Sequence, residues 1–316
     1  MRAVYAARQD PADPLAGLVV GQLPEPKPAD GWVTITVRAS SLNHHDLWSL
    51  RGVGLPADRL PMILGSDAAG IAPDGVPVVV YPLVAPPPGD PRDWSLLSEY
   101  HPGTMAEQVA VPVDNLVALP PVLTFAEAAC LPTAWLTAYH MLVARGRLES
   151  DSAVLIQGAG GGVATAATVL AVALGARVYV TSRDPAKLER VAELGATPVS
   201  SGGRLPERVD VVIETVGAAT IEHSLKCTRP GGRIVVSGAT SGHLAQIDLR
   251  RLFAFRVEIL GSTMGSPADL RDLLDLCVAR GVRPVVDSTH GLADASVAFD
   301  KLASGSAFGK LVLDHT

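Results

Sequence analysis

A cluster of glycines has the residue types and spacing of a turn that binds phosphate. Gly158, Gly160, Gly161 and Gly162 stand directly before Val163 and an alanine-rich run. Glycine permits positive φ and lets a ligand approach the backbone without a Cβ in the way. The free N–H groups at a helix start, aided by the helix dipole, attract a pyrophosphate. The cluster therefore predicts a dinucleotide site, although a glycine-rich turn in any α/β protein has the same composition.

The elements around the glycines strengthen this prediction. Residues 153–156 are an apolar run typical of a buried strand, and residues 163–174 are free of glycine, as suits a buried helix. Gly175 stands where a helix C′ residue is expected, and residues 177–181 form a second strand. Strand, turn, helix and strand make a βαβ unit. The segment fits the G-x-G-x-x-G/A motif in a relaxed form, in which the three key positions are occupied by Ala159, Gly161 and Ala164.

The end of the second strand indicates which cofactor binds. An NAD site places an acidic residue there to hold the ribose 2′-OH. This chain has there Thr181, Ser182 and Arg183, with Lys187 a turn further on. A hydroxyl and two cations suit a 2′-phosphate, which favours NADP(H) over NAD. The alternative is an ordinary helix start with Asp184 as N-cap and Pro185 at N1, and both descriptions can hold together.

Length and composition exclude several classes of protein. The 316 residues suggest two domains, and 48% apolar with 18% charged residues indicates a globular chain. A net charge of −6 argues against a nucleic-acid partner. The three cysteines are far apart and indicate neither a disulfide framework nor a zinc knuckle. No signal peptide or membrane-spanning run is expected, so the predicted location is cytoplasmic.

The first 125 residues are rich in short strands, as in a small β-barrel. Strands are expected within 32–40, 61–72, 76–82 and 105–120, a short helix within 41–52, and a loop over 85–103. Residues 124–146 then read as a helix. Thr124 and Glu127 have the spacing of a capping box, and Pro132 should kink or split the helix.

Strands and helices alternate after the βαβ unit, which predicts an α/β fold with a doubly wound parallel sheet. Further strands are expected within 195–201, 209–217, 233–240 and 256–265, and an amphipathic helix over 270–281. The loops after the strands should line a ligand crevice at the carboxyl edge of the sheet. This adds Val216 and Gly238 to the cofactor-binding candidates, beside the glycines, Val163, Ser182, Arg183 and Lys187.

Taken in order, several motifs resemble the medium-chain dehydrogenase/reductase superfamily, in particular its zinc-independent, quinone oxidoreductase-like branch. They are LNHHDLWSLRG, LPMILGSDAAG, GTMAEQVAVPVDNLVALP, LPTAWLTAY, VLIQGAGGGVA, the run from GARVYVTSRDPAK to ELGA, and the terminal GKLVL. The resemblance implies a GroES-like catalytic domain over 1–125, a Rossmann domain over 126–266 and a C-terminal return over 267–316. It also implies an active site in the cleft between the domains, and hydride transfer from NADPH to a small carbonyl or an activated C=C bond.

The departures from the superfamily concern its metal. At the positions that correspond to the catalytic zinc ligands the chain has Asn43, Ser66 and Thr133, none of which is a good zinc ligand. The lobe that corresponds to the structural zinc site, residues 85–101, contains no cysteine. His44, His45 and Asp46 could be considered as a replacement, but adjacent histidines point apart. No metal is therefore expected.

The resemblance also implies roles for individual residues. Asn43 should lie near the nicotinamide ribose, Asp46 belongs to the same N-x-x-D motif, and Thr137 should pack on the nicotinamide. The candidate proton donors are His44, His45 and Tyr81, and a solvent proton relayed through the ribose 2′-hydroxyl is an equal alternative. Local roles stay open, since Asp46 could cap a helix and His45 could bind backbone.

These observations predict an NADPH-dependent oxidoreductase that reduces a quinone, an enone or a related small carbonyl without zinc. The alternative is a catalytically silent NADP-binding sensor or regulatory protein. An S-adenosylmethionine-dependent methyltransferase is disfavoured, because it would want an acidic residue where Ser182 stands. A small-molecule substrate is expected, with no nucleic-acid or membrane partner. By the resemblance, the edge strand near 256–263 should pair across a homodimer.

Overall fold

The computed structural model describes residues 1–86 and 94–316, which divide into two compact units. The first unit is Met1–Thr133 with Val286–Thr316, and the second is Ala134–Val285. The sequence placed these boundaries at 125/126 and 266/267. In the structure α2 (Phe125–Ala128) belongs to the first unit and α8 (Pro267–Arg280) to the second.

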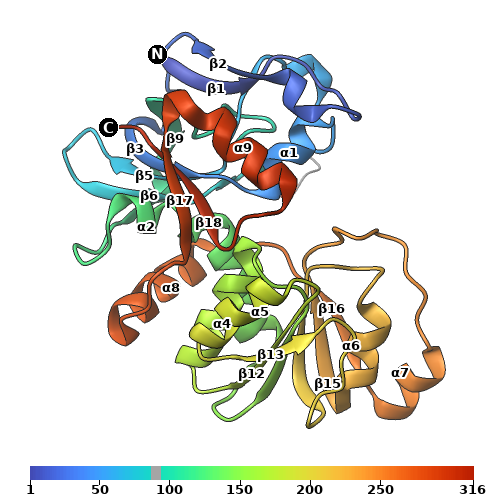
Figure 1. Cartoon of the computed structure of the whole chain (residues 1–316). Coiled ribbons are helices and arrows are strands. Elements are labelled where there is room, and N and C mark those ends of the chain that lie inside the picture. The colour runs from blue at the N-terminus through green and yellow to red at the C-terminus, as the bar shows by residue number, and fades with distance from the viewer. Residues whose placement is uncertain (87–93) are drawn as a thin grey trace. The chain divides into compact units, whose positions relative to one another are not determined.

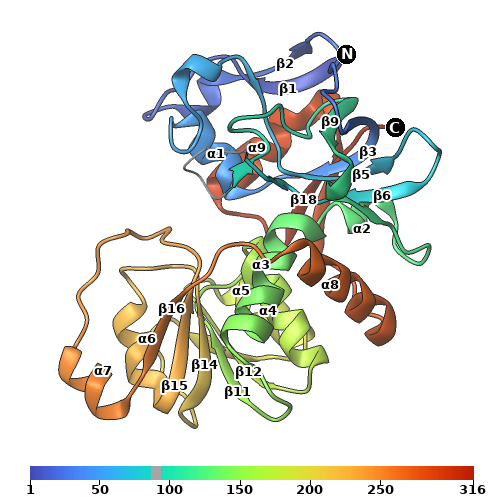
Figure 2. The same cartoon turned by 180° about the vertical axis from the view of Figure 1, so that it is seen from behind.

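The second unit contains a six-stranded parallel sheet in the order β13-β12-β11-β14-β15-β16, and Figure 2 shows it with β16 at its edge. Its strands are β11 (Ala153–Ile156), β12 (Arg177–Ser182), β13 (Thr197–Ser200), β14 (Val209–Glu214), β15 (Thr228–Val236) and β16 (Glu258–Gly261). The four residues of β11 are all buried, as expected of a strand covered on both faces. The predicted doubly wound sheet is confirmed.

Helices cover this sheet and connect its strands. They are α4 (Gly162–Ala173), α5 (Pro185–Glu193), α6 (Ile221–Cys227) and α7 (Leu249–Phe255). Helices α4 and α5 pack against β11, β12 and β13, whereas α6 and α7 pack against β14 and β15 (Figure 1). Gly175 follows α4 with φ +87°, which confirms the predicted C′ glycine.

The first unit is built around β3 (Trp32–Ser41), which pairs with β5, β9 and β18. Its other strands are β1 (Arg2–Ala6), β2 (Leu18–Gln22), β4 (Met62–Ile63), β5 (Asp67–Ile71), β6 (Pro77–Val80), β9 (Gln108–Pro112), β10 (Leu116–Ala118), β17 (Val286–Gly291) and β18 (Lys310–Asp314). The C-terminal segment returns here as β17, α9 (Ala295–Ser304) and β18 (Figure 1). Leu50 of α1 (His44–Leu50) and Phe299 of α9 lie in one core with Leu313. The C-terminus therefore completes the N-terminal fold.

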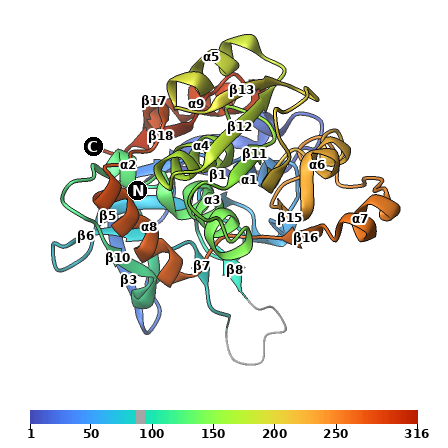
Figure 3. The ribbon, with the colours of Figure 1, turned by 90° about the horizontal axis from the view of Figure 1, so that it is seen from below.

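The predicted loop over 85–103 falls partly on 87–93, outside the described residues. Within its described part, β8 (Ser95–Leu96) pairs antiparallel with β7 (Leu83–Val84), as Figure 3 shows. A loop was the wrong prediction for these two residues, because a two-residue strand leaves no periodic pattern in the sequence. Short 3₁₀ turns occupy Pro14–Gly17, Ala57–Arg59, Val113–Asn115 and Leu292–Asp294.

The helical segment after residue 124 is interrupted as its proline predicts. Thr124 and Glu127 form the predicted capping box at the start of α2, with the Glu127 N–H donating to Thr124 Oγ1 at 3.2 Å. A π-helical turn at Leu131–Trp135 contains Pro132 and separates α2 from α3 (Leu136–His140). A second π-helical turn follows at Met141–Arg145. Proline lacks the N–H that a regular helix needs, which accounts for the break.

No helix in the described part of the chain combines the length and apolar character needed to cross a bilayer. All three cysteines are described and are free thiols.

Candidate functional site

The glycine turn of the second unit has the backbone geometry of a cofactor cradle. Gly158 and Gly160 have φ of +81° and +95°, in the left-handed region that side chains disfavour. Gly161 is the N-cap of α4, and a Cβ built on it would meet no atom within 4 Å. Open space therefore lies at the helix start, where the first N–H groups lack helical partners. These residues fit a pyrophosphate.

A chain of buried hydrogen bonds lies behind this turn. The Gly158 N–H donates to Thr181 Oγ1 at 3.0 Å, and that hydroxyl donates to Gln157 Oε1 at 2.8 Å. Gln157 Nε2 donates to Ser224 Oγ at 3.0 Å, and Ser224 donates to Glu214 Oε2 at 2.7 Å. All four side chains are buried. They tie the carboxyl ends of three neighbouring strands to the turn, which stiffens it before any ligand binds.

The other oxygen of Glu214 shapes the next loop. Glu214 Oε1 accepts from the N–H groups of Val216 and Gly217, at 2.9 and 3.0 Å, and from Thr220 Oγ1 at 2.8 Å. Val216 Cγ2 lies only 2.9 Å from where a Cβ on Gly158 would stand, so this loop packs directly on the turn. Sequence reasoning missed Gln157 and Glu214. The available signal was a polar side chain at the carboxyl end of an apolar stretch in each case, because such groups need buried partners.

The end of β12 has the charges that the sequence indicated. Ser182 is 8% exposed, and its hydroxyl accepts from the Asp184 N–H at 3.0 Å. Arg183 is exposed, and Lys187 lies on the first turn of α5. Asp184 is the N-cap of α5, since its carboxylate accepts from the Ala186 N–H at 2.9 Å. The predicted cap is confirmed, and the one carboxylate in this loop is engaged by backbone.

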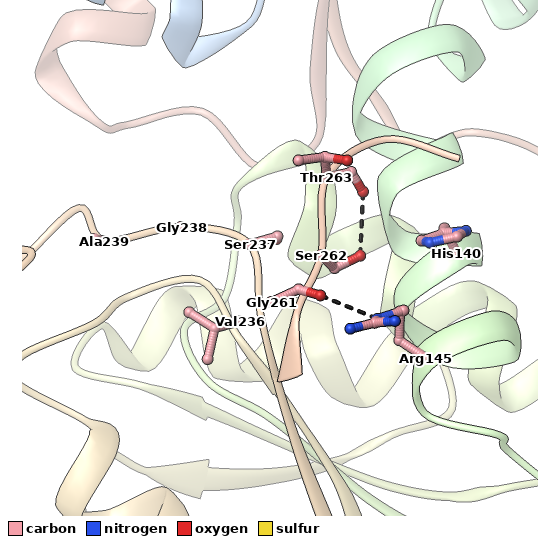
Figure 4. A pocket seen from close by; sticks show the side chains of 9 residues that line it. All are labelled: His140, Arg145, Val236, Ser237, Gly238, Ala239, Gly261, Ser262 and Thr263. Carbon is pink, nitrogen blue, oxygen red and sulfur yellow. Dashed lines mark hydrogen bonds between the residues drawn. The ribbon is translucent and has the colours of Figure 1, made fainter. Parts of the chain in front are cut away.

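A cavity of about 570 Å³ opens beyond the ends of β15 and β16 (Figure 4). Its lining comprises His140, Arg145, Val236, Ser237, Gly238, Ala239, Gly261, Ser262 and Thr263. Arg145 Nε donates to the Gly261 carbonyl at 3.0 Å, and His140 Nδ1 lies 3.3 Å from Asp269 Oδ2. Gly238 therefore borders a cavity, as the sequence suggested for a ligand-binding loop. Thr137 is buried within α3 and is absent from the lining.

The first unit holds a buried ammonium group that sequence reasoning also missed. Lys310, at the start of β18, is 2% exposed, and Asp67, at the start of β5, is 0% exposed. Lys310 Nζ donates to Asp67 Oδ2 at 3.0 Å, to Asn43 Oδ1 at 2.7 Å and to the Leu42 carbonyl at 2.7 Å. All three ammonium hydrogens are thus engaged. The sequence signal was a single cation inside the apolar terminal strand.

The three positions that correspond to zinc ligands do meet beside Lys310. Asn43 Nδ2 donates to Asp67 Oδ2 at 2.9 Å and to Ser66 Oγ at 3.4 Å, and Ser66 Oγ lies 3.0 Å from Thr133 Oγ1. An amide and two hydroxyls offer zinc no anionic or imidazole ligand, and the neighbouring ammonium would repel a cation. These residues do not fit the metal. Elsewhere in 1–86 and 94–316, no three His, Cys, Asp or Glu side chains gather as a metal site.

The Asp46 carboxylate accepts hydrogen bonds from two backbone N–H groups, which agrees with the alternative prediction that Asp46 caps a helix. Its Oδ2 accepts from the Asn43 N–H at 2.8 Å and its Oδ1 from the Gly65 N–H at 3.0 Å. Burial raises the pKa of this carboxyl to about 6. Both oxygens are used to join the start of α1 to the turn before β5. Asp46 therefore positions Asn43 and Ser66, and its catalytic role stays a prediction.

The remaining proton-donor candidates have separate surroundings. His45 Nε2 lies 2.7 Å from Glu99 Oε1, and His45 Nδ1 lies 3.3 Å from Ser49 Oγ, so His45 contacts side chains rather than backbone. His44 is exposed at the first position of α1. Tyr81 is buried just after β6, where its carbonyl accepts from Asn115 Nδ2 at 2.8 Å.

Comparisons with known proteins agree with both units. The alcohol dehydrogenase GroES-like domain model matches residues 29–121, and the zinc-binding dehydrogenase model matches residues 162–279. The acryloyl-coenzyme A reductase of Metallosphaera sedula is 30% identical over 328 residues, which cover 94% of this chain and 96% of that protein. The spectinabilin polyketide synthase system protein NorB of Streptomyces orinoci is 35% identical over 300 residues. That match covers 90% of this chain but 13% of NorB.

A solved structure described as an NAD-dependent alcohol dehydrogenase superposes with a TM-score of 0.90 at 33% identity, covering 100% of both chains. The predicted combination of a GroES-like domain and a Rossmann domain is thereby confirmed. The chain belongs to the medium-chain dehydrogenase/reductase superfamily and is an oxidoreductase of the kind that uses a nicotinamide cofactor.

Proposed function

We propose that this protein is an NADPH-dependent reductase of a small activated double bond or carbonyl, such as a quinone, an enone or an unsaturated thioester, and that it works without zinc. The observation that carries the proposal is the cluster of Asn43, Ser66 and Thr133, which meet at the metal position but offer no zinc ligand. A reaction without a metal favours substrates whose conjugation already makes them electrophilic. The likeness to an acryloyl-coenzyme A reductase supports this substrate class.

The preference for NADPH rests on the end of β12. Ser182 offers a hydroxyl, and Arg183 and Lys187 offer positive charge, whereas Asp184 is engaged as a helix cap. A 2′-phosphate gains charge-assisted hydrogen bonds from such residues. An NAD site would instead need a carboxylate to accept from the 2′-OH.

The chain's own residues have two tasks in this reaction. The turn at 158–162 and the start of α4 bind the pyrophosphate, and the buried network from Gln157 to Glu214 holds that turn in shape. Bound NADPH supplies the hydride. The protein must then orient the acceptor and stabilise the charge that develops on it.

Steady-state oxidation of NADPH and NADH with a quinone, an enone, an unsaturated acyl thioester and an aldehyde tests the proposal. We expect turnover with at least one conjugated acceptor, faster with NADPH, unchanged by a chelator, in protein with no bound zinc by elemental analysis. Activity that appears only after zinc is added would overturn the zinc-free assignment. Equal efficiency with NADH would overturn the cofactor preference.

A catalytically silent NADP-binding protein is the second candidate. It is favoured by one observation, since the side chains of Asp46 and His45 are both engaged in contacts within the first unit. This candidate predicts NADPH binding by calorimetry and no oxidation with any acceptor. Sustained turnover with one of the acceptors would dispose of it.

The proposed assembly is a homodimer formed along β16. Among the described residues this strand is the last of its sheet, so no strand pairs with one side of its backbone, and Leu249 and Phe253 of α7 are 67% and 72% exposed. Light scattering should give the mass of two chains. A monomer at working concentrations would contradict this.

A further inference from the structure

We propose that the Thr133 hydroxyl donates the hydrogen bond that polarises the carbonyl oxygen of the substrate, in the place where related enzymes hold a metal. The inference rests on the proposed reductase function and names the residue that replaces the metal in it. It follows from the direction of each hydrogen bond in the cluster around Lys310.

The direction of the hydrogen bonds in the cluster, from donor to acceptor, is fixed where the cluster begins at Lys310. An ammonium group can only donate, so the atom of the Asn43 amide that faces Lys310 Nζ at 2.7 Å must be the oxygen. The amide nitrogen then faces Asp67 Oδ2 and Ser66 Oγ, at 2.9 and 3.4 Å. The carboxylate can only accept, which agrees with the same orientation. Asn43 therefore presents a hydrogen to Ser66.

The same donor-to-acceptor direction continues from Asn43 through Ser66 to Thr133. Ser66 is 1% exposed and accepts from Asn43, and in the described residues the sole acceptor near its hydroxyl is Thr133 Oγ1 at 3.0 Å. Ser66 then donates to Thr133, and the hydrogen of Thr133 has no acceptor in the described part of the chain. Thr133 is partly exposed, so this hydrogen is available to a ligand.

The cluster is also rigid and nearly neutral. Asp67 Oδ2 accepts from Asn43 and Lys310, and Ser41 Oγ lies 2.8 Å both from that oxygen and from the Ala129 carbonyl, so the two acceptors share its single hydrogen. The charges of Asp67 and Lys310 offset each other. A donor at the end of aligned, buried hydrogen bonds needs little reorganisation when charge develops on its acceptor. All these residues belong to the first unit.

The reaction balances with Thr133 as a donor that keeps its proton. A conjugated carbonyl compound would gain a hydride at its β-carbon as a C–H bond of the dihydronicotinamide breaks and NADPH is oxidised to NADP+, and its π electrons would move onto the carbonyl oxygen as an enolate. The Thr133 hydroxyl stabilises that oxygen by hydrogen bonding. A proton from solvent then adds to the α-carbon, which completes reduction of the double bond and regenerates the carbonyl.

The test compares Thr133→Val, which removes the hydroxyl while keeping the side-chain shape, with Thr133→Ser, which keeps the hydroxyl. Loss of one such donor lowers kcat by about 10²–10³-fold. We expect that loss for the valine variant, recovery of most of it for the serine variant, and an intermediate loss for Ser66→Ala. Thr36→Val, at an exposed position of β3, is the matched control and should act as wild type.

Two further measurements separate a catalytic role from a structural one. NADPH affinity should be unchanged in every variant, and the carbonyl stretching frequency of a bound, unreactive enone analogue should shift less in Thr133→Val than in wild type. Wild-type turnover and carbonyl shift in Thr133→Val would overturn the inference and leave the reductase assignment standing. Absence of turnover in the wild-type protein with every acceptor would overturn the reductase assignment, and the inference with it.

Discussion

The buried ammonium of Lys310 offers the sharpest test of how the first unit is held together. Replacement by methionine keeps most of the side-chain volume and removes the charge. Asp67 is then left 0% exposed with its carboxylate unpaired, and Asn43 Oδ1 and the Leu42 carbonyl lose a donor each. Removing one partner of a buried ion pair costs about 3–5 kcal/mol.

This cost converts into a measurable thermal shift. In a unit of about 160 residues, 1 kcal/mol lowers Tm by about 2–4 °C, so Lys310→Met should lower the transition of the first unit by about 6–20 °C. Calorimetry of the full chain, with NADPH added to shift the other unit, measures this transition. Adding Asp67→Asn to Lys310→Met should recover part of the loss, because it removes the unpaired charge.

The matched control is Arg8→Met. Arg8 pairs with Asp10 in the same unit, and their side chains are 61% and 31% exposed, so its replacement should cost no more than about 1 kcal/mol. A loss in Lys310→Met as small as in the control would refute the reasoning. The same holds if the added Asp67→Asn recovers nothing.

Three other changes test separate parts of the molecule. Arg183→Ala with Lys187→Ala should weaken NADPH binding by about 10-fold or more and leave NADH binding unchanged, by calorimetric titration, because charge-assisted bonds to a 2′-phosphate are lost. Gly161→Ala should unfold at the wild-type temperature yet bind either cofactor more weakly, since its Cβ enters open space at the helix start. Gly158→Ala should also bind more weakly, and because Gly158 has φ +81° this variant should in addition lose about 1–2 kcal/mol of stability. Burial lowers the pKa of His315 to about 4, so the folded state favours the neutral ring. The neutral ring's contribution to the free energy of unfolding is complete above about pH 6.5 and is lost as pH falls toward 4. Between pH 6.5 and 4, the His315→Gln variant should therefore lose less stability than the wild type, by up to about 3 kcal/mol. Urea titrations at the two pH values measure this, and an equal loss in both proteins would contradict it.

Local patterns in the sequence predicted the elements of the second unit. The apolar run before Gly158, the glycine-free helix after it and the C′ glycine at Gly175 are all found as expected. The cap at Asp184 is also where the sequence indicated, as is the cap at Thr124 in the first unit. Each of these features depends on interactions within a few residues of chain, and side-chain type and spacing are sufficient to specify such interactions.

The residues that support the site could not be found in this way. Gln157, Glu214 and Lys310 each lie at the end of an apolar stretch, and no local pattern shows which groups would satisfy them. Lys310 is 243 residues from Asp67, and Gln157 is 67 from Ser224. Buried polar groups must find partners wherever the fold brings one near. The contact between the Asp46 carboxylate and the Gly65 N–H, 19 residues away, could not be predicted for the same reason.

The sequence by itself thus determined most of the secondary elements, the fold class and the position of the glycine turn, since periodicity, glycines and caps act over short stretches. The tertiary structure decided that the three metal positions meet as an amide and two hydroxyls beside a buried ammonium. It also decided that the Asp46 carboxylate joins the start of α1 to the turn before β5. Pairing among buried charges and hydrogen-bonding groups depends on three-dimensional proximity, which spacing along one chain does not specify.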